Sequence, residues 1–162
     1  MSILGLIVGL ALAASALAAP SRGDSVGTLR FADASGQAIT LDAPGVVYLV
    51  DFWALGCKPC IAEMPDLERL AKEYEPSRRF RLVTVVYGGW KGADLKKVAA
   101  NAGTKLPVYA DPDNWHDRLG VDAYPTKFLI RDGKLITRAR GGGTGSYAAW
   151  SAAVADELKR AP

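Results

Sequence analysis

The feature that most restricts the fold is an apolar run that ends shortly before a Cys-x-x-Cys pair. Residues 46–53 are mostly apolar without clean alternation, as in a central strand covered on both faces. The sequence Cys57-Lys58-Pro59-Cys60 follows, and from Cys60 onward apolar residues recur at helical spacing. A strand that leads into a helix here places both sulfurs at the helix N-terminus, where free N–H groups and the helix dipole favour a thiolate. The pair therefore indicates dithiol/disulfide exchange chemistry.

Two structural explanations of the pair are weaker. A structural zinc site needs four ligands, and besides its only two cysteines the chain has a single histidine, His116, which we interpret as a surface residue. A purely structural disulfide across so short a loop removes little entropy from the unfolded chain. We therefore expect a reactive pair, with no metal site and no cofactor.

Length and composition predict one folded domain without a nucleic-acid partner. A chain of 162 residues that is 49% hydrophobic and 23% charged can bury a sizeable core. The formal net charge is only +3, and the basic residues are scattered apart from a short cluster at residues 78–81. A nucleic-acid surface would need a more concentrated basic stripe.

The N-terminus is typical of a targeting segment. Residues 1–21 contain no charged side chain, and residues 3–17 are almost entirely apolar. Ala16-Leu17-Ala18 supplies the small-x-small pattern that precedes a signal-peptidase cut. We expect residues 1–18 to be a signal peptide or a membrane anchor. If the segment is not cleaved, residues 3–19 would anchor the protein in the inner membrane. Either way the remainder is exported, which predicts a periplasmic location where disulfides form and persist.

Strand and helix patterns alternate along the remainder of the chain. A turn signal at residues 34–36 predicts an N-terminal β-hairpin, Asp132-Gly133 predicts a second hairpin, and Pro65 is expected to kink the helix that follows the cysteines. The expected elements are strands at 28–32 and 37–41, a strand at 46–53, a helix from residue 60, a strand at 80–87, a helix at 93–102, a strand at 106–110, a short helix at 113–119, strands at 126–131 and 134–140, and a helix at 146–159. This order predicts an α/β domain with a mixed sheet between helices.

Three motifs together resemble the thioredoxin fold. Residues 50–54 read Val-Asp-Phe-Trp-Ala, residues 57–60 read Cys-Lys-Pro-Cys, and residues 124–126 read Tyr-Pro-Thr. The resemblance covers residues 26–162. Glu-Met-Pro at 63–65, the early hairpin and the inserted helix-strand segment before Tyr124 are similar to TlpA-type thiol-disulfide oxidoreductases, which include ResA and CcmG relatives.

The resemblance implies roles for the residues of the cysteine motif. Cys57, the more exposed sulfur in such folds, would attack a substrate disulfide, and Cys60 would resolve the mixed disulfide. Lys58 adds a cation that, with the helix N-terminus, should lower the pKa of Cys57 into the range of roughly 3.5–7.5. Pro59 presets the backbone at the helix start and, with Lys58, would lie against a substrate.

Four residues outside the motif also gain expected roles. Pro125 resembles a cis-proline that, with Tyr124, presents backbone groups to an extended substrate, although an ordinary trans proline is the alternative. Trp53 is expected to pack beneath the active-site loop, on the substrate side. Asp51 lies in a predicted buried strand, so a raised pKa would suit it as the base for Cys60.

Glu63 has two alternative readings. It stands three residues after Cys60 and therefore on the same side of the helix, where it could tune the sulfurs. An ordinary solvated helix glutamate explains the position equally well.

The combined expectation is an exported thiol-disulfide oxidoreductase acting on protein thiols and disulfides of the cell envelope, as a monomer and with a membrane electron donor. We expect a reductant, for cytochrome c maturation or envelope redox homeostasis. Alternatives are a periplasmic oxidase or isomerase, since Lys58 favours the thiolate, and a Cu(I)-handling binding protein, although the chain has only two methionines. A peroxidase is disfavoured because its attacking cysteine stands alone.

Overall fold

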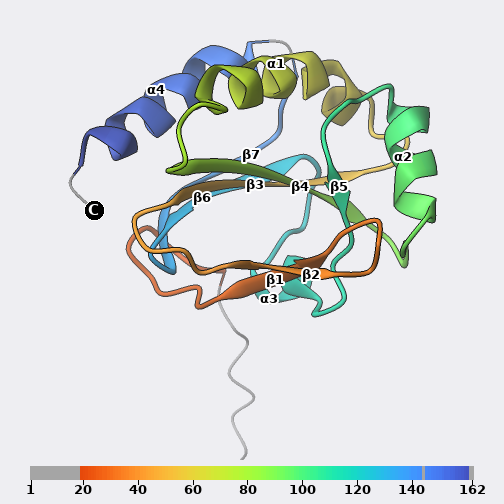
Figure 1. Ribbon diagram of the computed structural model, residues 1–162, viewed down its shortest axis with the longest axis horizontal. Helices are drawn as coiled ribbons and strands as arrows, with labels where there is room; N and C mark the ends of the chain where they lie inside the picture. The colour runs from red at the N-terminus through yellow and green to blue at the C-terminus, as the bar shows by residue number, and fades with distance from the viewer. Residues whose placement is uncertain (1–18, 144, 161–162) are drawn as a thin grey trace, which may run out of the picture.

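The apolar run after the first hairpin becomes the centre of a five-stranded sheet in the computed structural model, which describes residues 19–143 and 145–160. The sheet has the order β5-β4-β3-β6-β7, and a separate two-stranded sheet pairs β1 with β2 (Figure 1). The strands are β1 Leu29–Ala32, β2 Ala38–Leu41, β3 Val47–Ala54, β4 Phe80–Tyr87, β5 Val108–Tyr109, β6 Thr126–Arg131 and β7 Lys134–Arg140. The helices are α1 Lys58–Tyr74, α2 Asp94–Ala102, α3 Trp115–Arg118 and α4 Ser146–Lys159.

The sheet is mixed, as expected. β3 runs parallel to β4 and antiparallel to β6, and every β3 residue except the last is buried. Both faces are covered: α1, α2 and α4 lie on one side, and the β1–β2 hairpin with α3 lies on the other (Figure 1). The prediction of a mixed sheet flanked by helices with an N-terminal hairpin is confirmed, and the hairpin itself supplies much of the second layer.

Alternation along β3 divides its side chains between two cores. Leu49 and Trp53 belong to the hydrophobic cluster on the helical side, whereas Val50 and Phe52 belong to the cluster beneath the hairpin. Because successive side chains of a strand point to opposite faces, Asp51 lies on the helical side with Leu49 and Trp53. The carboxyl is therefore carried into the layer that contains α1.

Helix α1 begins earlier than the apolar pattern alone predicts. Cys57 is its N-cap, where its sulfur accepts a hydrogen bond from the backbone N–H of Cys60 at 3.3 Å. Pro59 in the first turn has no N–H to leave unsatisfied, so the helix starts at Lys58. The helix continues past Pro65 to Tyr74, and the kink expected at Pro65 stays a prediction.

Two elements are shorter than expected, because the backbone at their ends pairs elsewhere or adopts a different conformation. β5 holds only Val108 and Tyr109, and the next residue, Ala110, instead forms a bridge to Ala32 of the hairpin. α3 starts at Trp115 because Asn114 adopts a left-handed backbone with φ 59°. In contrast, the second hairpin turns at Asp132 and Gly133, both at positive φ, as an Asp-Gly turn requires.

The expected targeting segment, residues 1–18, lies outside the described residues. Within the described part of the chain, none of the helices has the length and apolar character needed to span a bilayer.

Candidate active site

The two cysteines form a disulfide at the start of α1. Their sulfurs are 2.07 Å apart and their Cα atoms 5.3 Å apart. Cys57 is partly exposed, whereas Cys60 is fully buried in the core on the helical side. The sulfur expected to attack is thus the one that solvent reaches, and the sulfur expected to resolve lies behind it. Lys58 and Pro59 between them are exposed.

The surface beside the disulfide is built at the carboxyl ends of β3 and β4. Ala54 at the end of β3 pairs with Tyr87 at the end of β4, which lies next to the cysteine loop. The ring of Tyr124 lies 5.2 Å from that of Tyr87, and the bond between Tyr124 and Pro125 is cis, as the resemblance implies. Burial first, and then nearby Tyr87 and acidic side chains, raise the pKa of Tyr124 to about 12, so its phenol remains protonated.

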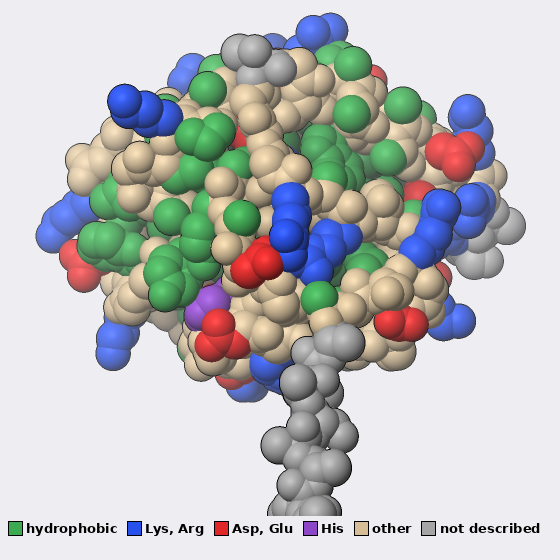
Figure 2. Space-filling view, turned by 180° about the vertical axis from the view of Figure 1, so that it is seen from behind, with side chains coloured by type: hydrophobic (Ala, Val, Ile, Leu, Met, Phe, Trp, Pro, Cys, Tyr) green, Lys and Arg blue, Asp and Glu red, His purple; other side chains and the backbone are tan. Residues whose placement is uncertain are grey.

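Large hydrophobic side chains remain uncovered in this region. Among the described residues, Leu55, Tyr87 and Trp90 are exposed, by 39%, 49% and 36%. Leu55 lies two residues before Cys57, and Tyr87 contacts the ring of His116 at 5.0 Å between centroids. Hydrophobic side chains gather on the same side of the molecule as this histidine (Figure 2). An apolar rim of this kind suits contact with a polypeptide.

A cluster of three charged residues is fully buried in the layer of α1. Lys127 of β6 stands directly opposite Asp51 of β3 in the antiparallel pairing. The Lys127 ammonium is 2.5 Å from Glu63 Oε1 and 3.3 Å from Asp51 Oδ1. All three side chains are at most 1% exposed. Glu63 is therefore not an ordinary solvated helix glutamate.

Two carboxyls share the Lys127 ammonium, and Asp51 is the one that lies farther from it. Neither Asp51 oxygen accepts a hydrogen bond within the described residues. Desolvation by burial raises the pKa of Asp51 from 3.8 to about 7; Lys127 opposes this rise and Glu63 adds to it. Asp51 can thus hold or release a proton near neutral pH, which is what a general base needs.

Trp53 occupies a fully buried place in the core on the helical side. Its indole N–H has no hydrogen-bond partner among the described residues. This position supports the packing expected of Trp53, whereas a direct contact with a substrate stays a prediction.

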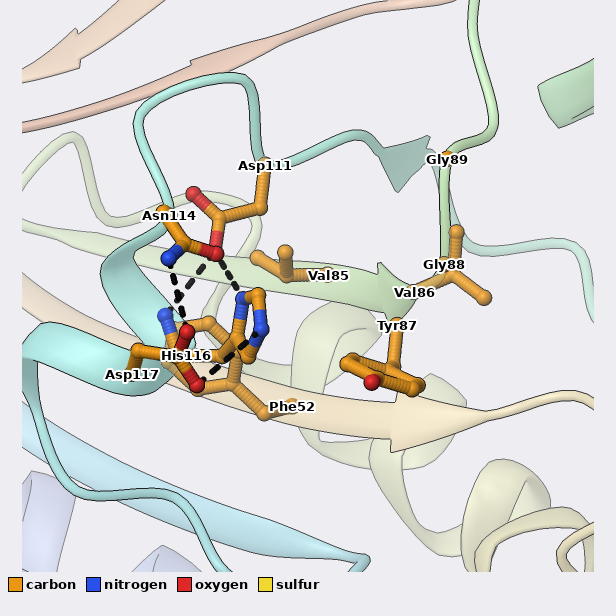
Figure 3. A pocket seen from close by; sticks show the side chains of 10 residues that line it. All are labelled: Phe52, Val85, Val86, Tyr87, Gly88, Gly89, Asp111, Asn114, His116 and Asp117. Carbon is orange, nitrogen blue, oxygen red and sulfur yellow. Dashed lines mark hydrogen bonds and ion pairs between the residues drawn. The ribbon is translucent and has the colours of Figure 1, made fainter.

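A pocket at the end of β4 was not predicted from the sequence. The pocket has a volume of about 410 Å³, and its walls are Phe52, Val85, Val86, Tyr87, Gly88, Gly89, Asp111, Asn114, His116 and Asp117 (Figure 3). His116 is not a free surface residue there, since its ring lies 2.9 Å from Asp111 and 3.4 Å from Asp117. The sequence did contain a signal for this grouping, because Asp111 and Asp117 are six positions apart and His116 lies between them.

Lys127 was also missed, although the sequence contains a signal for it. Lys127 stands two residues before Leu129 in the buried strand β6, so both side chains face the helical layer. A lysine on the inward face of a buried strand needs a buried partner. No cluster of three or more potential metal-binding side chains occurs within residues 19–143 and 145–160.

Comparison with known proteins agrees with this geometry. The family model described as "AhpC/TSA family" matches residues 23–139. The chain belongs to this family. It is 34% identical over 106 residues to "Thioredoxin-like protein YneN" of Bacillus subtilis, covering 63% of this chain and 61% of that protein. It is 32% identical over 114 residues to "Thiol-disulfide oxidoreductase ResA" of Bacillus thuringiensis, covering 67% and 64%. The chain therefore spans less than two thirds of these curated relatives.

A solved structure extends the likeness to the whole domain. The crystal structure of "a putative Thiol:disulfide interchange protein DsbE" from Chlorobium tepidum superposes with a TM-score of 0.72 at 28% identity. The match covers 85% of this chain and 98% of that one. The expected relationship to thioredoxin-fold thiol-disulfide oxidoreductases is confirmed.

Proposed function

We propose that the protein is a thiol-disulfide oxidoreductase that exchanges its Cys57–Cys60 pair with thiols and disulfides of other proteins. The observation that carries the proposal is the joint placement of the pair at the start of α1, with Cys57 partly exposed and Cys60 buried. A helix N-terminus favours the thiolate of Cys57, and access allows it to attack. The names of the relatives support the same activity.

In the reducing direction, the Cys57 thiolate attacks one sulfur of a substrate disulfide. A bond forms between Cys57 and that sulfur, and the other substrate sulfur leaves as a thiolate that takes up a proton. Cys60 then loses its proton, which we assign through water to Asp51, and displaces the substrate from Cys57. The products are the Cys57–Cys60 disulfide and a reduced substrate, so two electrons pass to the substrate.

We propose the reducing direction on the basis of burial. Cys60 is fully buried, and the charged cluster of the same layer holds two carboxyls against one ammonium. Apolar surroundings oppose ionisation of a thiol, and so does a nearby carboxyl once it has lost its proton. A dithiol that ionises poorly is less stable in its reduced state and therefore gives up electrons more readily. Lys58 acts in the opposite direction, but it is exposed and its effect is screened.

The cellular setting is part of the same proposal. The apolar segment at the N-terminus supports export to the periplasm, either as a cleaved signal peptide or as an inner-membrane anchor. There the protein would act as a monomer, receive electrons from a membrane donor and reduce envelope proteins, including the haem-attachment cysteines of cytochrome c.

Reduction of insulin disulfides by the full chain tests the activity. We expect turnover that is lost in Cys57→Ser, and a stable mixed disulfide in Cys60→Ser because the resolving sulfur is gone. Unchanged activity in Cys57→Ser would refute the role of Cys57. Lys134→Met, which changes an exposed residue of β7 and leaves the cysteine pair intact, is a control for general damage.

Equilibration against glutathione tests the direction. A reductant should have a potential well below that of the strongly oxidising DsbA, which is about −120 mV. A potential near that value would instead assign the protein as an oxidase or isomerase. Tight Cu(I) binding without disulfide exchange would assign it as a metal carrier.

A further inference from the structure

The connection between β7 and α4 is rich in glycine and lies directly on the buried charge cluster. The Gly141 N–H donates a hydrogen bond to the Pro125 carbonyl at 2.8 Å. A Cβ atom added to Gly142 would lie 2.0 Å from Glu63 Oε2 and 2.6 Å from Pro125 Cγ. Since real Cβ atoms do not approach that closely, only glycine fits between the carboxyl and the proline. The connection is thus part of the wall around Glu63.

This wall donates hydrogen bonds to Glu63. The Ser146 hydroxyl, in the first turn of α4, lies 3.0 Å from Glu63 Oε2, and the Gly143 N–H points to the same oxygen at 3.4 Å. The other oxygen, Oε1, faces the Lys127 ammonium at 2.5 Å. Both oxygens of Glu63 are therefore met by donors, which favours the carboxylate form.

The second carboxyl of the cluster has a different environment. Asp51 has the ammonium of Lys127 at 3.3 Å and no hydrogen bond to either oxygen among the described residues. Among the described residues, the charged groups that face it are Glu63 from α1 and Lys127 from β6, with none from α4. Because one ammonium neutralises one carboxylate, the less well supported carboxyl takes the proton.

We infer that Ser146 is a positioning residue, whose hydroxyl holds Glu63 as the ionised partner of Lys127 and so leaves Asp51 as the carboxyl that gains and loses a proton. The inference deepens the proposed function, on which it rests only for the use made of that proton. Ser146 itself touches neither cysteine nor substrate in this scheme.

A competing arrangement uses the same atoms. The Ser146 oxygen also lies 2.9 Å from the Gly143 carbonyl, and its single hydrogen can point to only one acceptor. If Glu63 were protonated, it would donate to Ser146, and Ser146 would donate to Gly143. The short contact between Glu63 and Lys127 opposes this arrangement, because a proton on Glu63 would remove the closer partner of a buried ammonium.

Carboxyl-carbon NMR of the full chain, labelled at Asp and Glu, distinguishes the two arrangements. The titration uses the oxidised protein, in which neither cysteine ionises, and Asp51→Asn and Glu63→Gln assign the signals. We expect a step near pH 7 at the Asp51 carboxyl carbon in the wild type, where Lys127 keeps Glu63 as its ionised partner. In Ser146→Ala, loss of a charge-assisted hydrogen bond should raise the proton-binding constant of Glu63 about tenfold, so that Glu63 takes a share of the step.

Matched variants separate this effect from general damage. Ser151→Ala removes another hydroxyl of α4, which lies 3.3 Å from the Tyr74 hydroxyl, and should leave both curves unchanged. Ser146→Thr keeps a hydroxyl and should restore the wild-type curves. If Ser146→Ala does not fold, Ser146→Gly removes the same hydroxyl without adding a titratable thiol.

Two results overturn the inference: a wild-type step near pH 7 at Glu63, or curves that do not change in folded Ser146→Ala or Ser146→Gly. Neither result depends on disulfide exchange. A protein that fails to reduce insulin but shows the expected titration would overturn the proposed function and leave the role of Ser146 standing.

Discussion

Asp51 lies where burial and charge oppose each other. Its side chain is fully buried beside one ammonium, which a second carboxyl approaches more closely. Because the folded protein holds a proton on Asp51 up to about pH 7 and the unfolded chain releases it near 3.8, the folded state binds more protons between these values. The free energy of unfolding should therefore fall as the pH rises through this window.

The first prediction concerns the substitution Asp51→Asn. It removes the cost of ionising a buried carboxyl, while Lys127 keeps Glu63 as its partner. We expect stability to increase at about pH 8 by at most roughly 4 kcal/mol, and to change little at about pH 4. Urea unfolding at both pH values measures this. Equal effects at the two values would contradict the raised pKa of Asp51.

The second prediction concerns Lys127→Met, which leaves two buried carboxyls without a cation. We expect a loss of about 3–5 kcal/mol at about pH 8 and a smaller loss at about pH 5, where the carboxyls can protonate. The same change at the exposed Lys134 of β7 is the control and should cost little. A similar, pH-independent loss at both sites would rule out the charge cluster as the cause.

For single residues, the sequence predicted burial within one strand or helix better than contacts between different elements. Burial of Asp51 followed from the apolar character of its own strand. Glu63 stayed ambiguous, because its helix spacing does not reveal that α4 and β6 cover it. Lys127 and Ser146 are brought to Glu63 from 64 and 83 residues away. No local pattern contains that information.

Helix α1 is the element that turns the cysteine motif into a reactive site. Its first turn includes Lys58 and its last turn includes Lys72. The same side chain therefore stands at the positive N-terminal end and at the negative C-terminal end of the helix dipole. Only the first lies next to Cys57. This symmetry offers a direct test of local electrostatics.

The third prediction is that Lys58→Glu raises the pKa of the Cys57 thiol in the reduced protein. A negative charge beside the sulfur opposes the thiolate, and exchange near neutral pH should slow severalfold. Alkylation rates measured against pH report the change. Lys72→Glu makes the same change of charge far from the sulfur and should leave the rates unaltered. Equal effects of both variants would point to net charge alone.

Elements were predicted reliably where the pattern was long and less well where polar side chains end a segment. The apolar run that becomes β3 and the Asp-Gly hairpin were both found in place. The short helix α3 lost its predicted beginning because the Asp111 carboxylate accepts hydrogen bonds from the backbone of Trp115 and His116, which fixes the start there. Such caps depend on the fold of the preceding loop.

The whole molecule is organised around one sheet with a separate core on each face. Residues before the predicted domain start at Val26 already pair with this sheet. Gly23 donates to the carbonyl of Leu135, Leu135 donates to that of Asp24, and Ser25 forms a bridge to Lys134. The residues just before the hairpin therefore continue the edge of the sheet beyond β7.

The fourth prediction compares two shortened chains, one beginning at residue 19 and one at Val26. The first keeps all contacts of residues 23–25, whereas the second loses two backbone hydrogen bonds to Leu135, at about 1 kcal/mol each. We expect the second chain to unfold at a Tm several degrees lower. Equal Tm values would place the domain start at Val26, as the sequence suggested.

The alternation of side chains in β3 has a consequence for how the chain can change. Inserting or deleting one residue between the beginning of β3 and Asp51 would turn the aspartate toward the hairpin and replace it with a hydrophobic neighbour on the α1 side. Lys127 would then keep only Glu63. We therefore expect natural variation in length to be tolerated in the turns of this protein but not within β3, where the count of residues decides which layer receives an acid.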